Sequence, residues 1–450
     1  MHRALFPILL VASSPVAVRA EPAAPLAALL TRPTELAGWL RDRDPLIDAQ
    51  RERIEAARAA ARQTRVLPNP QLNFGVSDFV IGQTNAASGG PGSANPALSL
   101  GQTLIFTAGV DQLIELGKRG PRQSAADLRA RAQAETAAGA LGGRIGEATQ
   151  ALGKLAYVAA RRGVVATNLA AAEKLRASEK LRLDHSDLSA LEFARIELDT
   201  EAVALQLARA ESDVAGAASA CSAVLYAACT ADGLGDPATL DAGAPLPATL
   251  PVVSGAAQAA IEARPARVAS KLEIDALNWD AELAHNRRIP DPTIGVGYTL
   301  DNLTVSGDQH QSLMFTIGIP LPVFDRGTHD EAASRATARA EAAEDRAAVR
   351  DAAGQVEALL AQRAMLEAAV ARMTSDTVPK STQIIAQTRR AFDLGQAPLA
   401  DLLLVERAHR DLLLELLDTR FDLFNVRAQL RQQLGLDDQA ARDASARSPS

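Results

Sequence analysis

The sequence predicts a mostly helical protein with a small β part, built from two copies of one long unit. Two stretches alternate apolar and polar residues with a period of two, as strands with unlike faces do. Ala-rich stretches with helical spacing surround them, and the second half of the chain repeats the order of the first at an interval of about 210 to 220 residues. Because this interval is far longer than a solenoid repeat, we expect a two-copy fold rather than an array.

The amino-acid composition excludes several classes of function. Aromatic residues make up 3% of the 450 residues, so the hydrophobic content of 47% is mostly Ala and Leu, which suits closely packed helices. The formal net charge of −7 offers no basic surface, and we expect no nucleic acid partner. The sequence has no pairing of a nucleophile with a base, no phosphate loop and no set of metal ligands. We therefore expect neither an enzyme nor a bound cofactor.

The chain begins with the features of a secretory signal. A basic start precedes an apolar run over residues 4–12, and Val18-Arg19-Ala20 has the small residues of a cleavage site. We expect residues 1–20 to be removed on export and residues 21–43 to form an N-terminal extension. No cysteine follows the signal directly, so a lipid-anchored cysteine is not expected. No other stretch approaches the ~20 apolar residues of a membrane helix, so any membrane contact is expected from strands.

Each copy is expected to begin with a helix and to continue into two strands. Repeat 1 covers residues 44–236 and repeat 2 covers residues 264–436, with a linker at 237–263 between them. Residues 437–450 are polar and are expected to form a disordered tail. The expected strands are, in order, at about 71–82, 97–114, 293–301 and 312–321.

Short motifs at the strands establish the correspondence between the repeats. Pro68-Asn69-Pro70, before the first strand, matches Pro290-Asp291-Pro292, 222 residues later. The strand ends read Glu115-Leu-Gly-Lys-Arg-Gly120 and Pro320-Leu-Pro-Val-Phe-Asp-Arg-Gly327, and their Arg-Gly pairs lie 207 residues apart. The first hairpin is therefore 15 residues longer than the second.

A long helix follows the strands in each repeat. The 65-residue and 69-residue stretches that lead from the strands to the next break would each span on the order of 100 Å as helices. Globular domains have no use for helices of this length, whereas tubular or coiled assemblies do. We expect a tip turn at 183–187 and another at 394–398, each followed by a return helix. Pro379, 16 residues before Gly395, is expected to kink its helix.

Several cysteine, histidine and aspartate residues could form a disulfide or bind a ligand. Cys221 and Cys229 either form a small-loop disulfide in an exported protein or remain buried thiols, and the sequence leaves both possibilities open. His329 and Asp330 lie in the first turn of a helix and are too few ligands for a metal site. His409 lies among leucines and is expected to pack between helices rather than to bind a ligand.

The strands need partners from outside the chain. A four-stranded sheet leaves two open edges, and closure by several chains into a barrel would satisfy every backbone group and permit a membrane-spanning site. We expect one face to contact lipid and the other to face inward. The residues expected to face lipid are Ile294, Val296, Tyr298, Phe315, Ile317 and Ile319. The residues expected to face inward are Gly295, Gly297, Thr316 and Gly318.

The paired strand starts, the strand ends and the duplicated long hairpins resemble the outer-membrane factor (TolC) family. Segments 115–120 and 320–327 are most similar to its heavy-metal branch, the CzcC/CusC type of cation efflux channel, and the resemblance covers roughly residues 40–436. It implies a homotrimer in the outer membrane, with four strands per protomer in a twelve-stranded transmembrane β-barrel above a long periplasmic helical tunnel. It also implies a periplasmic adaptor protein and an inner-membrane pump of the resistance-nodulation-division class as partners, and no cofactor.

The resemblance assigns roles to the tip turns. The family pattern of an aromatic residue, a Gly and an Asp is met by Phe392, Gly395 and Asp401, whereas repeat 1 has Asp184 for the Gly and Ala190 for the acid. The resemblance implies that Asp401, tripled by symmetry, forms an acidic ring that concentrates cations at a constriction. The alternative is a first-turn acid stabilised by the helix dipole. The residues implied to dock the adaptor are Leu394, Gly395, Gln396, Leu183, Asp184 and His185.

The function expected is a passive exit channel of a tripartite efflux pump, conducting divalent heavy-metal cations across the outer membrane. Small organic molecules and a secreted polypeptide are the alternative substrates. A periplasmic coiled-coil adaptor or scaffold is the alternative from another class, because it also uses long helical hairpins. Such a protein needs no duplicated strand pairs, so the strands favour the channel.

Overall fold

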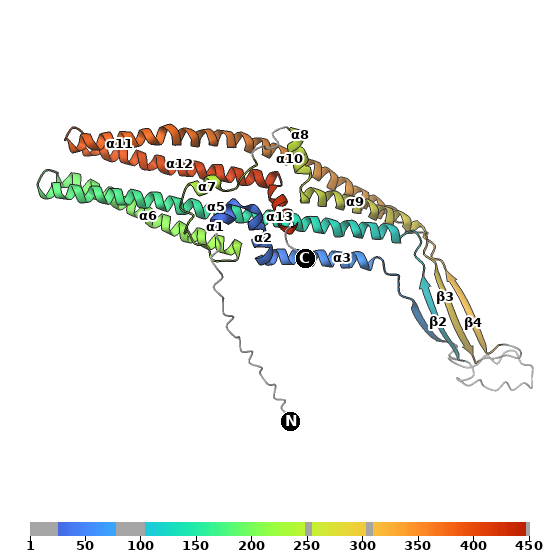
Figure 1. The fold of residues 1–450 in the computed structure, drawn as a ribbon. Helices are drawn as coiled ribbons and strands as arrows, with labels where there is room; N and C mark the ends of the chain where they lie inside the picture. The colour runs from blue at the N-terminus through green and yellow to red at the C-terminus, as the bar shows by residue number, and fades with distance from the viewer. Residues whose placement is uncertain (1–25, 78–103, 248–253, 303–308, 447–450) are drawn as a thin grey trace, which may run out of the picture.

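The computed structural model describes residues 26–77, 104–247, 254–302 and 309–446. The protein is elongated, with a four-stranded sheet at one end and two long helical hairpins that run away from it (Figure 1). The turns of both hairpins lie at the end opposite the sheet. None of the helices described is long and apolar enough to cross a membrane. The predicted fold class, long duplicated helices with a small β part, is confirmed.

Repeat 1 contains one helix before the sheet and a hairpin of two helices after it. Its elements are α3 (Pro45–Gln63), β1 (Gln71–Ser77), β2 (Ile105–Leu113), α5 (Arg119–Asp184) and α6 (Ala190–Leu225). The start of α3 is capped by Asp44, whose side chain accepts a hydrogen bond from the Leu46 backbone N–H at 2.9 Å. The 66-residue helix α5 persists because it is rich in Ala and has a proline only in its first turn. The predicted strand residues 78–82 and 97–103 lie outside the described residues.

Repeat 2 has the same order of elements. They are α9 (Pro265–His285), the 3₁₀ turn η1 (Asn286–Arg288), β3 (Thr293–Asp301), β4 (Gln311–Gly318), α10 (Thr328–Arg372), α11 (Val378–Asp393) and α12 (Leu399–Gln433). A π-helical turn, Met373–Thr377, joins α10 to α11. Pro379 follows this turn and has no N–H to donate to the carbonyl four residues earlier, so the wider π turn lies where the α-helical bond is missing.

Residues outside the two repeats also form helices. These are α1 (Leu26–Thr31), α2 (Pro33–Arg43), α7 (Ala238–Ala242), α8 (Ser254–Glu262) and α13 (Leu436–Ala446). The prediction of a disordered tail is wrong for residues 437–446, because α13 packs against α5 and α2. Asp437 forms a buried ion pair with Arg431 at 2.8 Å. Asp438 lies so close to α5 that a Cβ at Gly142 would clash with its carboxylate.

The largest core lies at the middle of the molecule, where α1, α2 and α13 cover the long helices. Its fully buried side chains include Leu36, Leu40, Leu152, Leu155 and Phe424. A smaller core lies between the two hairpins at their tips. The N-terminal helices α1 and α2 pack against α5, and the C-terminal helix α13 packs against both α5 and α12.

The sheet has the order β1-β2-β3-β4 and is antiparallel throughout. Repeat 1 and repeat 2 share it, because β2 pairs with β3. In the register, Val110 lies opposite Val296, and Val296 lies opposite Phe315. Directly opposed residues point to the same face, so this register separates an apolar face from a polar face across all four strands.

Candidate functional site

The residues to which the sequence assigned functional roles lie at the two ends of the molecule. The helical tips lie at one end and the sheet at the other, joined by α5 and by α10 with α11 (Figure 1). In the ranges that the structure describes, no three His, Cys, Asp or Glu side chains are grouped as a metal site requires. Asp330, weighed above as a metal ligand, instead pairs with Arg287.

Both tip turns close with the same hydrogen-bond pattern. The N–H of Gly395 donates to Phe392 O at 2.9 Å, and the N–H of Gln396 donates to Ala391 O at 2.8 Å. In repeat 1 the equivalent bonds run from Ser186 to Leu183 and from Asp187 to Arg182, at 2.9 and 2.8 Å. This is the Schellman motif, in which one residue after the helix takes a left-handed conformation.

The equivalent of Gly395 in repeat 1 is therefore Ser186, not Asp184. Each turn is followed by a capping residue, Ser189 in repeat 1 and Pro398 in repeat 2. The third residue of the return helix is then Glu192 or Asp401. The expectation that repeat 1 has Ala190 at the position of the acid is wrong, and both tips carry a carboxylate there. Sequence spacing alone does not reveal that Glu192 and Asp401 are equivalent, because the turn of repeat 1 has Ser186 in place of a glycine.

The two tip carboxylates have different surroundings. Glu192 forms a capping box with Ser189, and hydrogen bonds from the Ser189 hydroxyl and backbone N–H lower the pKa of Glu192. Asp401 is exposed and has no side-chain partner in the described part of the chain. The fold thus favours the charged form of Glu192, while the carboxylate of Asp401 is exposed to solvent.

The tip turns are exposed around a shared apolar core. Leu175, Leu188 and Ile196 of repeat 1 pack with Phe392, Leu399, Leu402 and Leu403 of repeat 2. The guanidinium of Arg182 also lies over the Phe392 ring, 5.0 Å from its centroid. Of the predicted docking residues, Asp184, His185, Leu394, Gly395 and Gln396 are exposed and Leu183 is half-buried. The core fixes the two turns relative to each other and leaves their outer surfaces open.

A buried carboxylate ties the two hairpins together behind the tips. Asp199 on α6 accepts hydrogen bonds from Arg407 at 2.7 Å and from Arg410 at 3.0 Å, both on α12. Glu406 lies beside this cluster, where burial raises its pKa, and the charges of Arg389 and Arg410 oppose this rise. His409 packs between α11 and α12, hydrogen-bonded to the Ser381 hydroxyl at 2.7 Å, and burial lowers its pKa.

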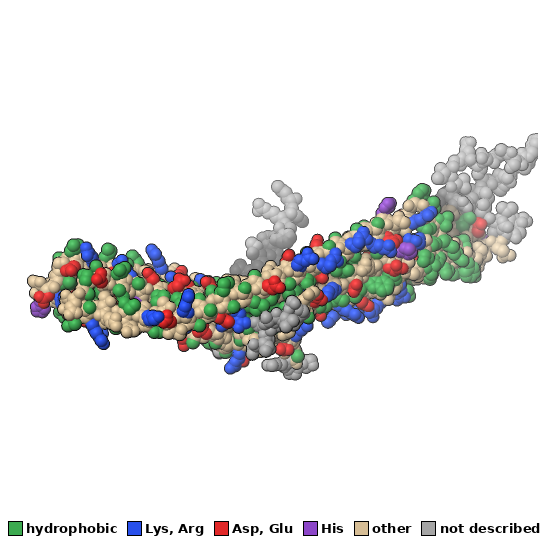
Figure 2. Space-filling view, turned by 90° about the horizontal axis from the view of Figure 1, so that it is seen from above, with side chains coloured by type: hydrophobic (Ala, Val, Ile, Leu, Met, Phe, Trp, Pro, Cys, Tyr) green, Lys and Arg blue, Asp and Glu red, His purple; other side chains and the backbone are tan. Residues whose placement is uncertain are grey.

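The sheet end carries the strand residues named above. Ile294, Val296, Tyr298, Phe315 and Ile317 lie on one face of the sheet, and all are exposed in this single chain. Leu72, Phe74 and Val76 of β1 join the same face. Figure 2 shows hydrophobic side chains gathered at this end, with charged side chains along the helices. That the apolar face contacts lipid stays a prediction.

The opposite face of the sheet is polar and closely packed. Asn73 donates to Asp111 across the strands, and the Thr107 hydroxyl lies against the backbone of Gly75. A Cβ at Gly295 would clash with the Asp111 carboxylate and with Thr316. The glycines expected to face inward thus leave room for polar side chains on the same face.

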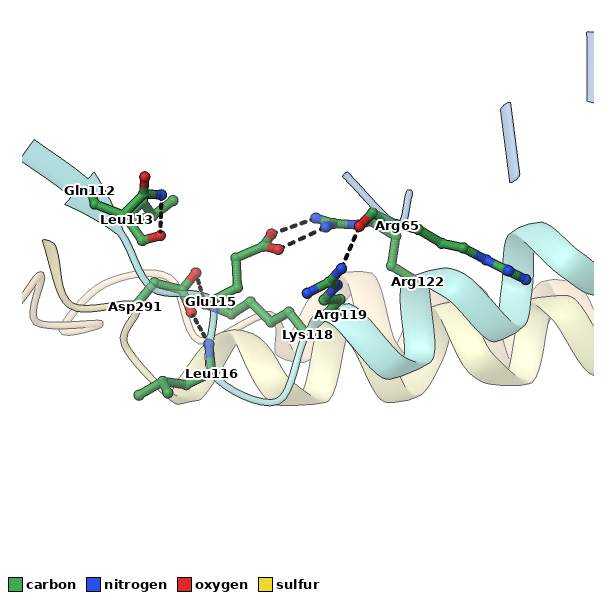
Figure 3. Close-up of polar contacts among 9 residues, drawn as sticks. All are labelled: Arg65, Gln112, Leu113, Glu115, Leu116, Lys118, Arg119, Arg122 and Asp291. Carbon is green, nitrogen blue, oxygen red and sulfur yellow. Dashed lines mark hydrogen bonds and ion pairs between the residues drawn. The ribbon is translucent and has the colours of Figure 1, made fainter. Parts of the chain in front are cut away.

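A polar junction holds the sheet to the helices (Figure 3). Asp291, from the strand start of repeat 2, accepts the backbone N–H of Leu116 at 2.9 Å and pairs with Lys118 at 2.7 Å. Glu115 forms a two-point ion pair with Arg122. The motifs that marked the repeats in the sequence therefore meet in space, where they fix the direction in which α5 leaves the sheet.

Cys221 and Cys229 are joined in a disulfide, which the sequence had left open. Both residues belong to the core at the middle of the molecule. The bond links the end of α6 to the segment after it, where Tyr226 has a left-handed φ of 53°.

Comparisons with known proteins agree with this architecture. Residues 256–436 match the family model described as outer membrane efflux protein. The fold resembles the solved structure of CusC, with a TM-score of 0.72 and 17% identity over 90% of this chain and 92% of that one. It also resembles the outer-membrane channel OprN, with a TM-score of 0.69 and 16% identity over 93% of each chain. The outer membrane protein VceC from Vibrio cholerae gives a TM-score of 0.67 and 17% identity over 90% of this chain and 96% of that one.

No curated protein matches the chain. The family match lies in the second half of the chain, and the fold is that of solved outer-membrane channels. Both findings agree with the resemblance to the outer-membrane factor (TolC) family that the duplicated motifs predicted.

Proposed function

We propose that this protein is the outer-membrane exit duct of a tripartite efflux pump and that it conducts divalent heavy-metal cations. The observation that carries this proposal is the placement of one sheet, shared by both repeats, at the far end of two helical hairpins from their tips. Such a chain joins a membrane-facing end to a tip end through helices on the order of 100 Å long. A periplasmic coiled-coil scaffold would use the hairpins but has no use for the sheet.

The open edges of the sheet support assembly of three copies. Among the described strands, β1 and β4 each pair on one side only, and such open edges favour pairing with another chain. When the β2–β3 register within the chain is repeated between β4 and the β1 strand of a second copy, Ile317 lies opposite Phe74 and Phe315 lies opposite Val76. This pairing keeps apolar residues on one face, so three chains would close a twelve-stranded barrel with one apolar surface.

The tips support the role of a narrow, cation-favouring end. Glu192 and Asp401 occupy equivalent positions, so a trimer would carry two carboxylates from each chain at this level. A summed negative potential in a narrow passage raises the local concentration of cations. The exposed turns around Ser186 and Gly395 offer a surface for the periplasmic adaptor, and an inner-membrane pump of the resistance-nodulation-division class would supply the energy.

Cell fractionation and mild solubilisation test the proposal. The protein is expected in the outer-membrane fraction and, in mild detergent, as a trimer. Recovery as a soluble monomer would contradict it. Deletion of the gene tests the substrate: sensitivity to divalent metal salts alone supports metal cations, whereas sensitivity to organic toxicants alone supports organic solutes as the substrate.

A further inference from the structure

The segment after β4, residues 319–327, exposes an unusual run of apolar side chains. We call this segment the β4 connector. Ile319, Leu321 and Val323 continue the alternation of β4 beyond the end of the strand, and each is more than half exposed. Phe324 follows them with a relative exposure of 102%, so no described part of the chain covers its ring. A fully exposed aromatic ring at the end of an apolar stripe requires a partner.

Repeat 1 lacks the equivalent residues. Each strand leads to a glycine with a left-handed φ just before the long helix, Gly117 at 73° and Gly327 at 71°. In the register, Asp111 of β2 and Gly318 of β4 are equivalent, since each lies opposite the first residue of its partner strand. Gly117 follows Asp111 by six positions, whereas Gly327 follows Gly318 by nine. Measured to these glycines, the β4 connector is three residues longer, because the Arg-Gly pair opens α5 at Arg119 in repeat 1 but precedes α10 in repeat 2, where the helix begins at Thr328.

The β4 connector is held by its own hydrogen bonds. The Val323 N–H donates to Leu321 O at 2.8 Å, and the Gly327 N–H donates to the Asp325 carboxylate at 2.9 Å. The Arg326 Nε donates to Pro322 O at 3.2 Å. These bonds, with the fixed φ of two prolines, hold the segment in a shape that projects Phe324 outward. These three bonds lie within the connector itself and do not use the ring of Phe324.

One cation beside Phe324 has no acidic partner. Arg287 pairs with Asp330, and Arg288 pairs with Glu331 at 3.3 Å. The exposed guanidinium of Arg326 donates only to a backbone carbonyl, and no acidic side chain pairs with it in the residues described. Its remaining N–H groups can donate to an external anion.

We propose that Phe324 and Arg326 bind a phospholipid where the sheet meets the helices. The Phe324 ring and Leu321 enter the acyl region near the headgroups, and the Arg326 guanidinium donates hydrogen bonds to the lipid phosphate. The surface continues the apolar face of the sheet, so this inference rests on the proposed outer-membrane location. Pairing with a second copy would use β4 itself, whereas the additional residues lie beyond the strand. The connector thus fixes the depth of the sheet in the leaflet that adjoins the helices.

Tryptophan fluorescence in vesicles of brominated phosphatidylcholine tests the position of Phe324. The variant Phe324→Trp is reconstituted, and the signal of the native Trp39 and Trp279 is subtracted using the parent protein. Phe315→Trp reports on the sheet, and Leu198→Trp, exposed on α6, reports on the helical part. We expect lipids brominated deep in the acyl chains to quench the fluorescence of the tryptophan at position 315. Lipids brominated near the headgroups should quench the tryptophan at position 324 at least about half as strongly. The tryptophan at position 198 should not be quenched by either lipid.

The comparison separates failure of the inference from failure of the proposed function. Quenching at 315 without quenching at 324 would overturn the lipid contact and would assign the connector to a second copy of the chain. Absence of quenching at both positions would overturn the outer-membrane location on which the inference rests.

The phosphate contact has its own test. Native mass spectrometry of the detergent-solubilised protein counts bound phosphatidylglycerol at limiting lipid. Arg326→Gln is expected to lower the bound lipid at least about two-fold, because the charge-assisted hydrogen bonds are lost. The matched variant Arg372→Gln, at an exposed arginine of α10, should leave it unchanged. Equal binding by the Arg326→Gln variant and the parent would overturn the role of Arg326.

Discussion

Ser186 and Gly395 occupy the same position in the two tip turns, with φ angles of 64° and 70°. Glycine adopts this left-handed conformation freely, whereas a residue with a Cβ does so at a cost of about 1–2 kcal/mol. The Schellman hydrogen bonds are the same in both turns, so repeat 1 holds a strained residue where repeat 2 has none.

The substitution Ser186→Gly is expected to raise the free energy of unfolding by about 1 kcal/mol, because it relieves this strain. Gly395→Ala should lower it by a similar amount. Denaturant unfolding, followed by circular dichroism, measures both. Gly354→Ala on α10 is the control: nothing lies within 4 Å of the added Cβ, and alanine favours a helix interior, so stability should rise. Equal effects of the two Gly→Ala variants would contradict the role of the turn.

Pairing between copies can be tested by a disulfide across the proposed strand register. Phe74→Cys with Ile317→Cys places the two sulfurs on directly opposed residues of β1 and β4, within reach of each other. Oxidation should therefore give a covalent trimer on a denaturing gel. The combination of Phe74→Cys with Leu313→Cys, four residues out of register, is the control. If the control cross-links and the first pair does not, the register is wrong.

The Asp199 cluster is expected to hold the tips in their observed arrangement. Asp199→Asn removes the charge shared by Arg407 and Arg410, and leaving the largely buried guanidinium of Arg410 without it costs about 3 kcal/mol, while the exposed Arg407 is solvated and adds little. The two hairpins should then separate more readily, and single-channel conductance in lipid bilayers should rise. Asp393→Asn, an exposed acid near the same tip, is the matched control. Unchanged conductance in the Asp199→Asn variant would show that the cluster does not restrain the tips.

Asp438 makes the stability of the C-terminal helix depend on pH. Burial raises its pKa from 3.8 to about 6, while Arg264 and Arg442 oppose this rise and Asp437 adds to it. The folded protein therefore binds this proton more tightly than the unfolded chain. Its stabilising contribution is complete below about pH 4 and is lost as the pH rises to about 6, a change of about 3 kcal/mol.

Thermal unfolding between pH 4 and 7 checks this dependence. The Asp438→Asn variant should lose the part of the pH dependence that falls between pH 4 and 6, because asparagine does not titrate. Asp443→Asn, an exposed acid on the same helix, should keep it. An unaltered pH profile in the Asp438→Asn variant would mean that other groups cause the effect.

The sequence predicts most of the architecture because the architecture depends on local patterns. Period-two alternation, proline positions and the doubled Pro-Asn-Pro and Pro-Asp-Pro motifs are enough to place the strands, the long helices and the tips. The duplication predicts two strands in each repeat, but no motif predicts that β2 of repeat 1 pairs with β3 of repeat 2.

The errors arise where long-range contacts decide the structure. Helix α13 has a polar sequence typical of a disordered tail, but Arg431 neutralises Asp437 and Gly142 makes room for Asp438. The equivalence of Glu192 and Asp401 could not be predicted from the sequence, because Ser186 adopts a left-handed backbone conformation that is normally expected of glycine. The disulfide between Cys221 and Cys229 depended on geometry that spacing does not fix.

The proposed function requires that this protein conducts cations passively. Single-channel recording of the purified protein in planar lipid bilayers, under a potassium chloride gradient, tests this most directly. We expect discrete conductance steps with a reversal potential that favours cations, and a shift of that potential toward zero in the Asp401→Asn variant. Absence of conductance steps, or a reversal potential that favours anions, would contradict it.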